Sequence, residues 1–338
     1  MTIEPFGQTA EGEAVQRVTI AGGGLTAKIM TWGAVVQDLR LDGHAPPLVL
    51  GFERFEDYPA RSPYFGAIAG RYANRIRDGR FELDGHIVQV DTNFLGKHLL
   101  HGGIKGIGKR VWTIADAAPD FVRLTLRDRD GEMGFPGNLD IECIYRLADG
   151  ALKVELTAQT DAPTLCNLAQ HSYFNLDDGG SSDVLGHRVM IDADSYVPVD
   201  SESIPIGGTQ TVAGTAFDFR KLRSIAWDKG GSQFVYDHNW CVAHARRGVT
   251  KIVRLEGARS GVAMEVWTSE PGLQFYAGNK LAIEGGGLDG RSYAAFAGLC
   301  LEPQIWPDSP NHPYFPQAVL RPGETYRQIT EYRFGKAL

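Results

Sequence analysis

Apolar and polar residues alternate along most of the readable segments of this chain, with the period of two that is typical of β-strands. The clearest segments are residues 25–30, 81–90, 139–160 and 262–279. Within them, Asp84-Gly85 and Asp149-Gly150 predict tight turns between paired strands, and two more short strands are expected around Pro271-Gly272. No stretch longer than about ten residues shows a helical period, and residues 53–60 allow at best one or two helical turns. The pattern therefore predicts an all-β fold, a large antiparallel β-sandwich with few short helices.

The composition is that of an ordinary globular protein, with 43% hydrophobic and 22% charged residues among 338. We find no linker, low-complexity tract or internal repeat, so a single domain over residues 1–338 is the simplest prediction. The net charge of −7 and the lack of a basic block argue against nucleic acid or an anionic membrane as a partner. The N-terminus lacks the basic and apolar regions of a secretory signal, and no apolar run reaches transmembrane length, so we expect a cytoplasmic protein.

The cysteines also fit the expectation of a cytoplasmic protein. Cys143, Cys166, Cys241 and Cys300 are far apart and lie mostly in strand-like runs. This spacing favours buried free thiols over disulfides or a metal cluster.

A glutamate followed by a proline-rich loop is the first candidate for function. The apolar run AFAGLCL leads into Glu302 and then into PQIWPDSPNHP, residues 303–313. If the run is a strand, Phe296, Gly298, Cys300 and Glu302 share one face, and the prolines after Glu302 end regular structure. Burying an acid there is costly unless something uses or satisfies it. Glu302 is therefore either a catalytic or ligand-binding group or a structural cap of the loop, and these residues alone do not decide between the two.

Four other polar clusters interrupt the strand pattern. Residues 66–79 contain Asn74 and Arg75, and residues 93–112 form a glycine-rich segment with His101. In residues 167–176, a strand would point His171, Tyr173 and Asn175 to one face. Asp237 and Asn239 lie in a polar break that an ordinary Asx-turn explains equally well. Long polar loops inside a compact domain are usually functional, so these clusters are candidates for the lining of a cleft.

Together these residues suit a polyhydroxylated ligand. The side chains of Asn74, Arg75, His101, Asp237 and Gln274 offer hydrogen-bond groups for hydroxyls, and nearby aromatic residues offer flat surfaces for the C–H face of a sugar ring. The sequence shows no metal-ligand spacing and no G-x-S-x-G elbow. A histidine and a glutamate remain as the plausible proton-transfer pair.

Motifs in these clusters resemble those of the aldose 1-epimerase (galactose mutarotase) family. The matching segments occur in the family's order: GRYANRI from Gly70, LHGG from Leu100, DGEMGFPGNL from Asp130, HSYFNL from His171, YDHN from Tyr236, PGLQFYAGN from Pro271 and LEPQIWPDSPNHPYFP from Leu301. The chain departs from the usual pattern at Gln170, where the family commonly has Asn, and at Pro303 and Ile305-Trp306. None of these departures replaces a proton-transfer group.

The resemblance implies a β-supersandwich that interconverts the α and β anomers of free aldohexoses such as galactose and glucose, with no cofactor and no metal. By motif position, Glu302 corresponds to the general base and His171 to the general acid. Histidine titrates near neutrality, so we expect a cationic His171 at little cost beside carboxylates. The resemblance also implies sugar-binding roles for Asn74, Arg75, His101, Tyr173, Asp237 and Gln274.

Three alternatives remain open at the level of the sequence. An epimerase of a phosphorylated sugar would need extra cations, which Lys97, Lys105, Lys109 and Arg110 could supply. A sugar-binding protein without catalysis is the second alternative. A glycoside hydrolase is the third, and it would require Asp237 as the partner carboxylate of Glu302. The preferred hexose, and the choice between a monomer and a weak homodimer, also stay open.

Overall fold

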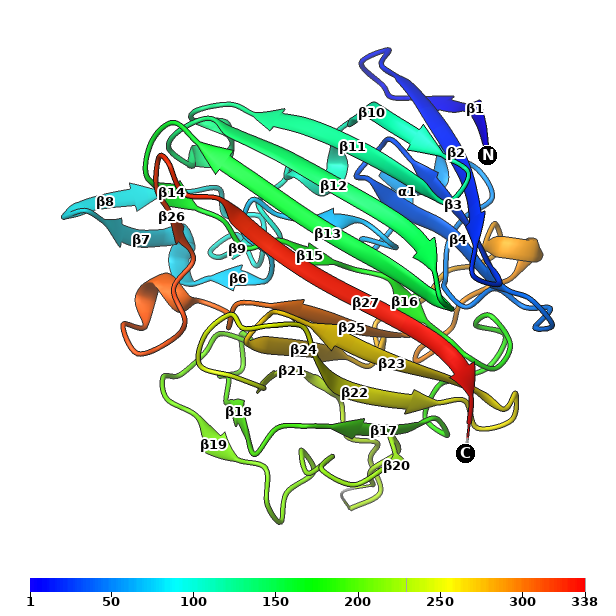
Figure 1. The fold of residues 1–338 in the computed structure, drawn as a ribbon. Coiled ribbons are helices and arrows are strands. Elements are labelled where there is room, and N and C mark those ends of the chain that lie inside the picture. The colour runs from blue at the N-terminus through cyan, green and yellow to red at the C-terminus, as the bar shows by residue number, and fades with distance from the viewer. Residues whose placement is uncertain (229, 338) are drawn as a thin grey trace.

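The structure is a computed structural model that describes residues 1–228 and 230–337. Its largest element is a nine-stranded sheet that crosses Figure 1 diagonally, with the long strand β27 (Tyr326–Lys336) at its centre. In spatial order the other strands are β10 (Thr113–Ala118), β11 (Phe121–Asp128), β12 (Leu139–Ala148) and β13 (Ala151–Thr160) on one side of β27, and β23 (Val262–Thr268), β22 (Thr250–Glu256), β17 (Arg188–Ile191) and β20 (Arg223–Ser224) on the other.

A six-stranded sheet carries most of the candidate site. Its strands are, in order, β16 (Tyr173–Phe174), β25 (Leu299–Gln304), β24 (Gly272–Tyr276), β21 (Asp237–Cys241), β18 (Ser195–Val197) and β19 (Gln210–Thr211). A four-stranded N-terminal sheet contains β1 (Thr2–Gln8), β2 (Ala14–Gly22), β3 (Leu25–Met30) and β4 (Val35–Leu41). All strand pairs in the described residues are antiparallel, as the sequence predicts.

The remaining elements are short. Four two-stranded pairs join β5 (Ile68–Ala69) to β15 (Ala169–Gln170), β6 (Arg75–Ile76) to β9 (Leu99–Leu100), β7 (Arg80–Leu83) to β8 (His86–Gln89), and β14 (Thr164–Leu165) to β26 (Val319–Leu320). The helical elements are α1 (Asp57–Arg61) and the 3₁₀ turns η1 (Arg77–Gly79), η2 (Ile107–Lys109), η3 (Glu132–Gly134), η4 (Leu288–Gly290) and η5 (Ser309–Asn311). No helix in the described residues has the length and apolar character needed to cross a bilayer.

The predicted hairpins are confirmed. Strands β12 and β13 pair from Leu139 opposite Thr160 to Ala148 opposite Ala151, and burial alternates along both strands. Asp149 and Gly150 between them have φ of 54° and 73°, the left-handed conformation that a two-residue type I′ turn requires. Asp84 and Gly85 make the same turn between β7 and β8. The alternation and the turn residues thus specify these hairpins locally.

The six-stranded sheet has two chemically different faces. On one face, Leu273 and Phe275 of β24 and Leu299 and Leu301 of β25 pack into the largest hydrophobic cluster, which also contains Tyr332 of β27. Because side chains alternate, Gln274, Cys300 and Glu302 point to the opposite face. The core thus holds this sheet against the nine-stranded sheet and leaves a polar face free for a site.

The strand that carries Glu302 differs from the expectation. Phe296 has a left-handed φ of 65°, so it does not share a strand with Glu302, and β25 begins at Leu299. The strand also continues through Pro303 to Gln304 instead of ending at Glu302. The carbonyl of Pro303 accepts a hydrogen bond from Gln328 Nε2 at 2.8 Å, so the backbone at this position faces away from β24. Since β16 pairs only with Leu299 and Cys300, no ladder bond is lost at the proline.

Candidate active site

A cavity of about 270 Å³ lies over the polar face of the six-stranded sheet. The structure brings all eight residues predicted for the site to its wall: Asn74, Arg75, His101, His171, Tyr173, Asp237, Gln274 and Glu302. They come from segments separated by up to 228 positions in the sequence. A cavity of this size with convergent polar groups suits a ligand as small as a monosaccharide.

Strand register places the acidic and amide side chains on this face. Gln274 of β24 lies directly opposite Glu302 of β25 and, on the other side, opposite Asn239 of β21. Asp237 is two positions from Asn239 in β21 and therefore shares its face. The sequence interpretation placed Asp237 and Asn239 in a break between strands, which is wrong, because both lie within a paired strand whose turn-forming residues are overridden by the sheet.

His171 and Glu302 form the chemical centre of the cavity. Their Nε2 and Oε2 atoms are 3.5 Å apart, and both side chains are nearly fully buried. The other ring nitrogen of His171, Nδ1, is 3.6 Å from Cys300 Sγ, and Tyr173 packs on the ring with centroids 5.3 Å apart. Within the described residues, Glu302 Oε2 has no hydrogen-bond partner. The histidine is thus held on two sides, and the carboxyl oxygen beside it is free to engage a ligand.

Burial shifts the two groups in opposite directions. It lowers the pKa of His171 to about 4, although its own backbone carbonyl and Asp237 act to raise that pKa. Burial also raises the pKa of Glu302 well above its usual value, and Asp237 adds to this while Arg75 opposes it. The expectation of a readily cationic His171 is therefore wrong, because desolvation outweighs the neighbouring carboxylates. Desolvation thus favours the uncharged form of each group, a neutral His171 and a protonated Glu302.

Asp237 is fixed by two donors. Gln274 Nε2 donates to its Oδ1 at 2.7 Å, and the Arg75 guanidinium donates to its Oδ2 at 3.1 Å. Burial alone would raise the pKa of Asp237, but Arg75, His238 and Gln274 together lower it, so this carboxyl is ionised. The cavity therefore contains one fixed anion paired with a cation, next to a pair that can exchange a proton.

Asn74 and His101 hold each other at the rim. Both have left-handed φ, 65° and 50°, and the His101 N–H donates to the Asn74 carbonyl at 2.9 Å. In return, the Asn74 N–H donates to His101 Nδ1 at 3.2 Å. Gly102 follows at φ 83°, against the Gly70 carbonyl, where a side chain would not fit. Burial, helped by His171, Arg75 and Lys109, lowers the pKa of His101 well below its usual value, so the ring is neutral.

The hydrogen bond from the Asn74 N–H to His101 Nδ1 also decides whether the cavity could hold a metal. His101, His171 and Glu302 offer ligand atoms that lie within 4.8 Å of one another, a proximity that sequence spacing could not reveal. However, Nδ1 of His101 must be unprotonated to accept the Asn74 N–H, so the neutral ring carries its proton on Nε2. A protonated nitrogen does not bind a metal. This arrangement makes His101 a hydrogen-bond donor, and the three side chains do not fit a metal ion as they stand.

The structure also shows which of the remaining polar residues lie outside the cavity, a distinction that the sequence could not make. Asn175 lies outside the cavity and bonds to the carbonyls of Ser182 and Ala297, because β16 spans only two residues and does not extend to it. Arg71, Arg77, His98 and His312 also lie outside the cavity lining. Six further lining residues were missed: Pro63, Tyr64, Phe94, Leu100, Tyr276 and Lys280. Tyr276 could have been found, since it is two positions from Gln274 in a strand.

The cations of the glycine-rich segment do not face this cavity. Lys97 pairs with Glu202 at 2.7 Å, and Arg110 pairs with the buried Asp128. Lys105 and Lys109 line a different cavity. Among the lysines of the described residues, Lys280 lines the cavity that contains His171 and Glu302, and the sequence interpretation did not single it out.

The chain is similar to known proteins over nearly its whole length. The profile of the family described as aldose 1-epimerase matches residues 16–333. The galactose mutarotase of Bos taurus is 40% identical over 331 residues, which covers 96% of this chain and 95% of the relative. The aldose 1-epimerase of Escherichia coli K12 is 38% identical over 344 residues, with 96% of each chain covered. The crystal structure of a GalM/aldose epimerase homologue from C. elegans superimposes with a TM-score of 0.88 at 31% identity, covering 96% of this chain and all of the other.

Proposed function

Because the chain belongs to the aldose 1-epimerase family and is an aldose 1-epimerase, we propose that Glu302 and His171 are the two groups that move protons in its reaction. The observation that carries this proposal is the 3.5 Å separation of Glu302 Oε2 and His171 Nε2 within one cavity. In a cyclic aldose, the hydroxyl oxygen O1 and the ring oxygen O5 are bonded to the same carbon. An acid and a base this close can therefore reach both oxygens of one sugar.

The proposed reaction needs two linked proton transfers. The Glu302 carboxylate removes the proton of O1 while the protonated Nε2 of His171 delivers one to O5. The C1–O5 bond breaks, and the open aldehyde turns about its C1–C2 bond. The ring closes on the other face as His171 takes the proton back from O5 and Glu302 returns one to O1. No C–H bond breaks, so an acid and a base are sufficient for every step of the reaction.

The shared proton links the structure to this cycle. One proton on the pair resides either on Glu302, with His171 neutral, or on His171, with Glu302 ionised. Ring opening starts with the proton on His171 and Glu302 ionised. It ends with the proton on Glu302 and His171 neutral, which is the arrangement that burial favours. Each closure restores the starting arrangement. The enzyme thus needs the pair to keep a single proton, whichever member carries it.

The other lining residues are proposed to hold the sugar. Asp237, held by Arg75 and Gln274, accepts from sugar hydroxyls, and the Nε2–H of His101 donates to a sugar oxygen. Arg75 can also offset the negative charge that develops as C1–O5 breaks. Asn74 acts mainly on these neighbours, through Arg75 and His101, and Tyr173 packs against the His171 ring.

We further propose that the substrates are free aldohexoses, galactose and glucose among them. The bovine relative is named for galactose. Lys97 and Arg110, which an epimerase of phosphorylated sugars could have used, are paired with carboxylates away from this cavity. We also propose that residues 1–338 form one domain that acts in the cytoplasm as a monomer or weak homodimer. The continuity of the core from Val18 to Tyr332 supports one domain, and the free cysteines suit a reducing compartment.

Polarimetry tests the roles directly. Starting from pure α-galactose or α-glucose, Glu302→Gln and His171→Asn should each lower turnover by roughly 10²–10⁴-fold, the usual contribution of a positioned acid or base. Galactose binding, measured by calorimetry, should persist in both variants. His86→Asn, a change at an exposed histidine outside the cavity, is the control and should keep the native rate. Near-native turnover of either cavity variant would refute the assignment.

A further inference from the structure

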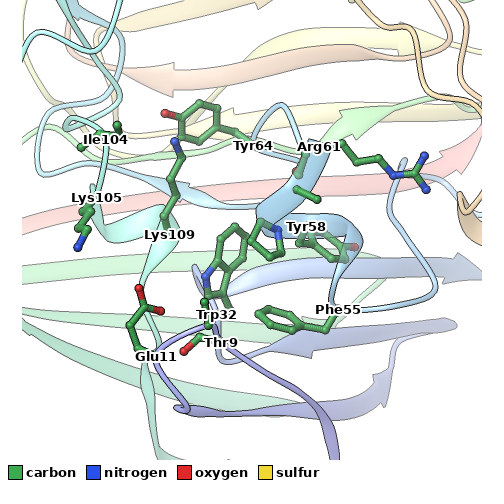
Figure 2. Close-up of a pocket in the computed structure, with 15 residues that line it drawn as sticks. Thr9, Glu11, Trp32, Phe55, Tyr58, Arg61, Tyr64, Ile104, Lys105 and Lys109 are labelled. Atoms are coloured by element: carbon green, nitrogen blue, oxygen red, sulfur yellow. The ribbon is translucent and has the colours of Figure 1, made fainter.

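A second, larger cavity lies on the other side of Tyr64 and is shown in Figure 2. Its volume is about 450 Å³, within the range of ligand-binding pockets. Tyr64 lines both cavities. Its ring centroid is 4.7 Å from that of His101 and 5.8 Å from that of His171, and Lys109 Nζ lies 5.1 Å from it. A single aromatic ring thus separates the catalytic histidines from a cavity that the proposed reaction does not use.

Two cations of the glycine-rich segment line this second cavity. Lys105 and Lys109 are both exposed, and neither forms an ion pair with a carboxylate in residues 1–228 and 230–337. Partial burial of the Lys109 side chain lowers its pKa, and the charge of Asp91 acts in the opposite direction. The neighbouring Arg61 does not compete for a ligand, because it pairs with Asp57 and its side chain extends away from the lysines in Figure 2.

Trp32 supplies a second, independent sign of a ligand. Its side chain lines the cavity and the residue is only 7% exposed, yet its indole N–H donates to no residue in the described part of the chain. In Figure 2 the indole nitrogen faces the side of the cavity where Glu11 and Thr9 lie. Because this N–H is unpaired and is not itself sealed off from the open space of the cavity, it can donate to a ligand there.

We infer that this cavity binds a phosphorylated monosaccharide, at a site separate from the catalytic cavity. The ammonium groups of Lys105 and Lys109 would hold the phosphate, and the Trp32 N–H would donate to an oxygen of the ligand. Glu11 would repel a bare phosphate, but its carboxylate accepts hydrogen bonds from sugar hydroxyls, as the Thr9 hydroxyl also can. The mixture of two cations, one anion and aromatic surface therefore fits a phosphate joined to a sugar better than either part alone.

The experiment tests whether this site is separate from the cavity that contains His171 and Glu302. Glucose 6-phosphate is titrated by calorimetry into the full-length protein, with and without saturating galactose, and inorganic phosphate and glucose are the comparison ligands. Binding of glucose 6-phosphate should persist when galactose saturates the catalytic cavity. It should also be tighter than binding of inorganic phosphate, or of glucose in the presence of galactose. Loss of binding in saturating galactose would overturn the inference, as would equal affinity for inorganic phosphate.

Variants identify the residues. Lys105→Met and Lys109→Met should each weaken binding about tenfold, the lower end for a charge-assisted hydrogen bond. Trp32→Phe keeps an aromatic ring but removes the N–H, and should weaken binding about two- to tenfold. Lys97→Met, in the same segment but paired with Glu202, is the matched control and should bind as the native protein does. If Lys97→Met weakened binding as much as Lys109→Met, or if Lys105→Met and Lys109→Met both bound as the native protein does, the inference would be wrong.

Discussion

Replacing Asp237 by Asn should move the pH range of activity toward acid. Asp237 raises the pKa of Glu302 and of His171, and it does so as a charge, so the isosteric amide removes the effect while keeping the shape. Below the pKa of His171, about 4, the pair gains a second proton and the base is lost. Above the raised pKa of Glu302, the pair loses its only proton and the acid is lost. Activity is therefore confined between these two pKa values, and both fall in Asp237→Asn.

The size of the shift follows from the strand register. Asp237 in β21 and Glu302 in β25 are separated by the single strand β24, and Asp237 is two residues along β21 from Asn239, the residue level with Glu302. Two strand spacings across the sheet and two residues along it place the two positions about 12 Å apart. At that separation and an effective dielectric constant of about 20, two unit charges interact by about 1.4 kcal/mol. This corresponds to roughly one pH unit. Loss of Asp237 also frees Arg75 to act on Glu302, and this effect has the same sign.

The assay is the pH dependence of kcat/KM for α-galactose, by polarimetry, after subtraction of the uncatalysed rate at each pH. The alkaline limb should move about one pH unit toward acid, and the acid limb should move in the same direction. Asp200→Asn is the control, because Asp200 also pairs with an arginine, Arg77, but lies outside the cavity lining. An alkaline limb that stayed in place or moved toward higher pH would refute the electrostatic reasoning.

Two further predictions concern arginines of the same motif. Arg75→Ala should raise KM and lower kcat together, because Arg75 orients Asp237 both before and during ring opening; an unchanged KM would remove it from the sugar-binding set. Arg71→Met should lower the free energy of unfolding in urea by about 3–5 kcal/mol, since Oδ2 of Asp128 and the carbonyls of Pro136 and Gly137 lose their donor at about 1–3 kcal/mol each, while Arg110 still pairs with the other oxygen of Asp128. The exposed pair of Arg127 with Asp140 is the control, and Arg127→Met should cost less than about 1 kcal/mol.

Several features of the fold follow from local rules and could be read from the sequence. Alternation identifies β12, β13 and β24, and Asp-Gly pairs set the type I′ turns, because side-chain period and turn conformation depend only on near neighbours. The residues of the site could be named from the motifs, and the structure gathers all eight at one cavity. The catalytic and binding roles themselves stay predictions until the variants are measured.

Where local rules failed, a tertiary interaction overrode them. Asp237 and Asn239 have turn propensity, but pairing of β21 with β24 and β18 holds them in a strand. The pattern around His171 predicts a strand that reaches Asn175, but β16 ends at Phe174 and Asn175 bonds elsewhere. Lys105 and Lys109 could not be assigned to a cavity from sequence, because the fold forms two neighbouring cavities that share Tyr64 as a lining residue.

The sequence by itself determined the long alternating strands, the Asp-Gly turns and the identity of the polar residues, since each is fixed by side-chain chemistry and short-range conformation. Only the tertiary structure decided which residues lie opposite one another across strands, which face of the sheet is buried, and in which direction burial shifts each pKa. The pKa of His171 shows why. It depends on how completely water is excluded around the ring, and that is a property of segments far apart in the chain that meet only when the fold is complete.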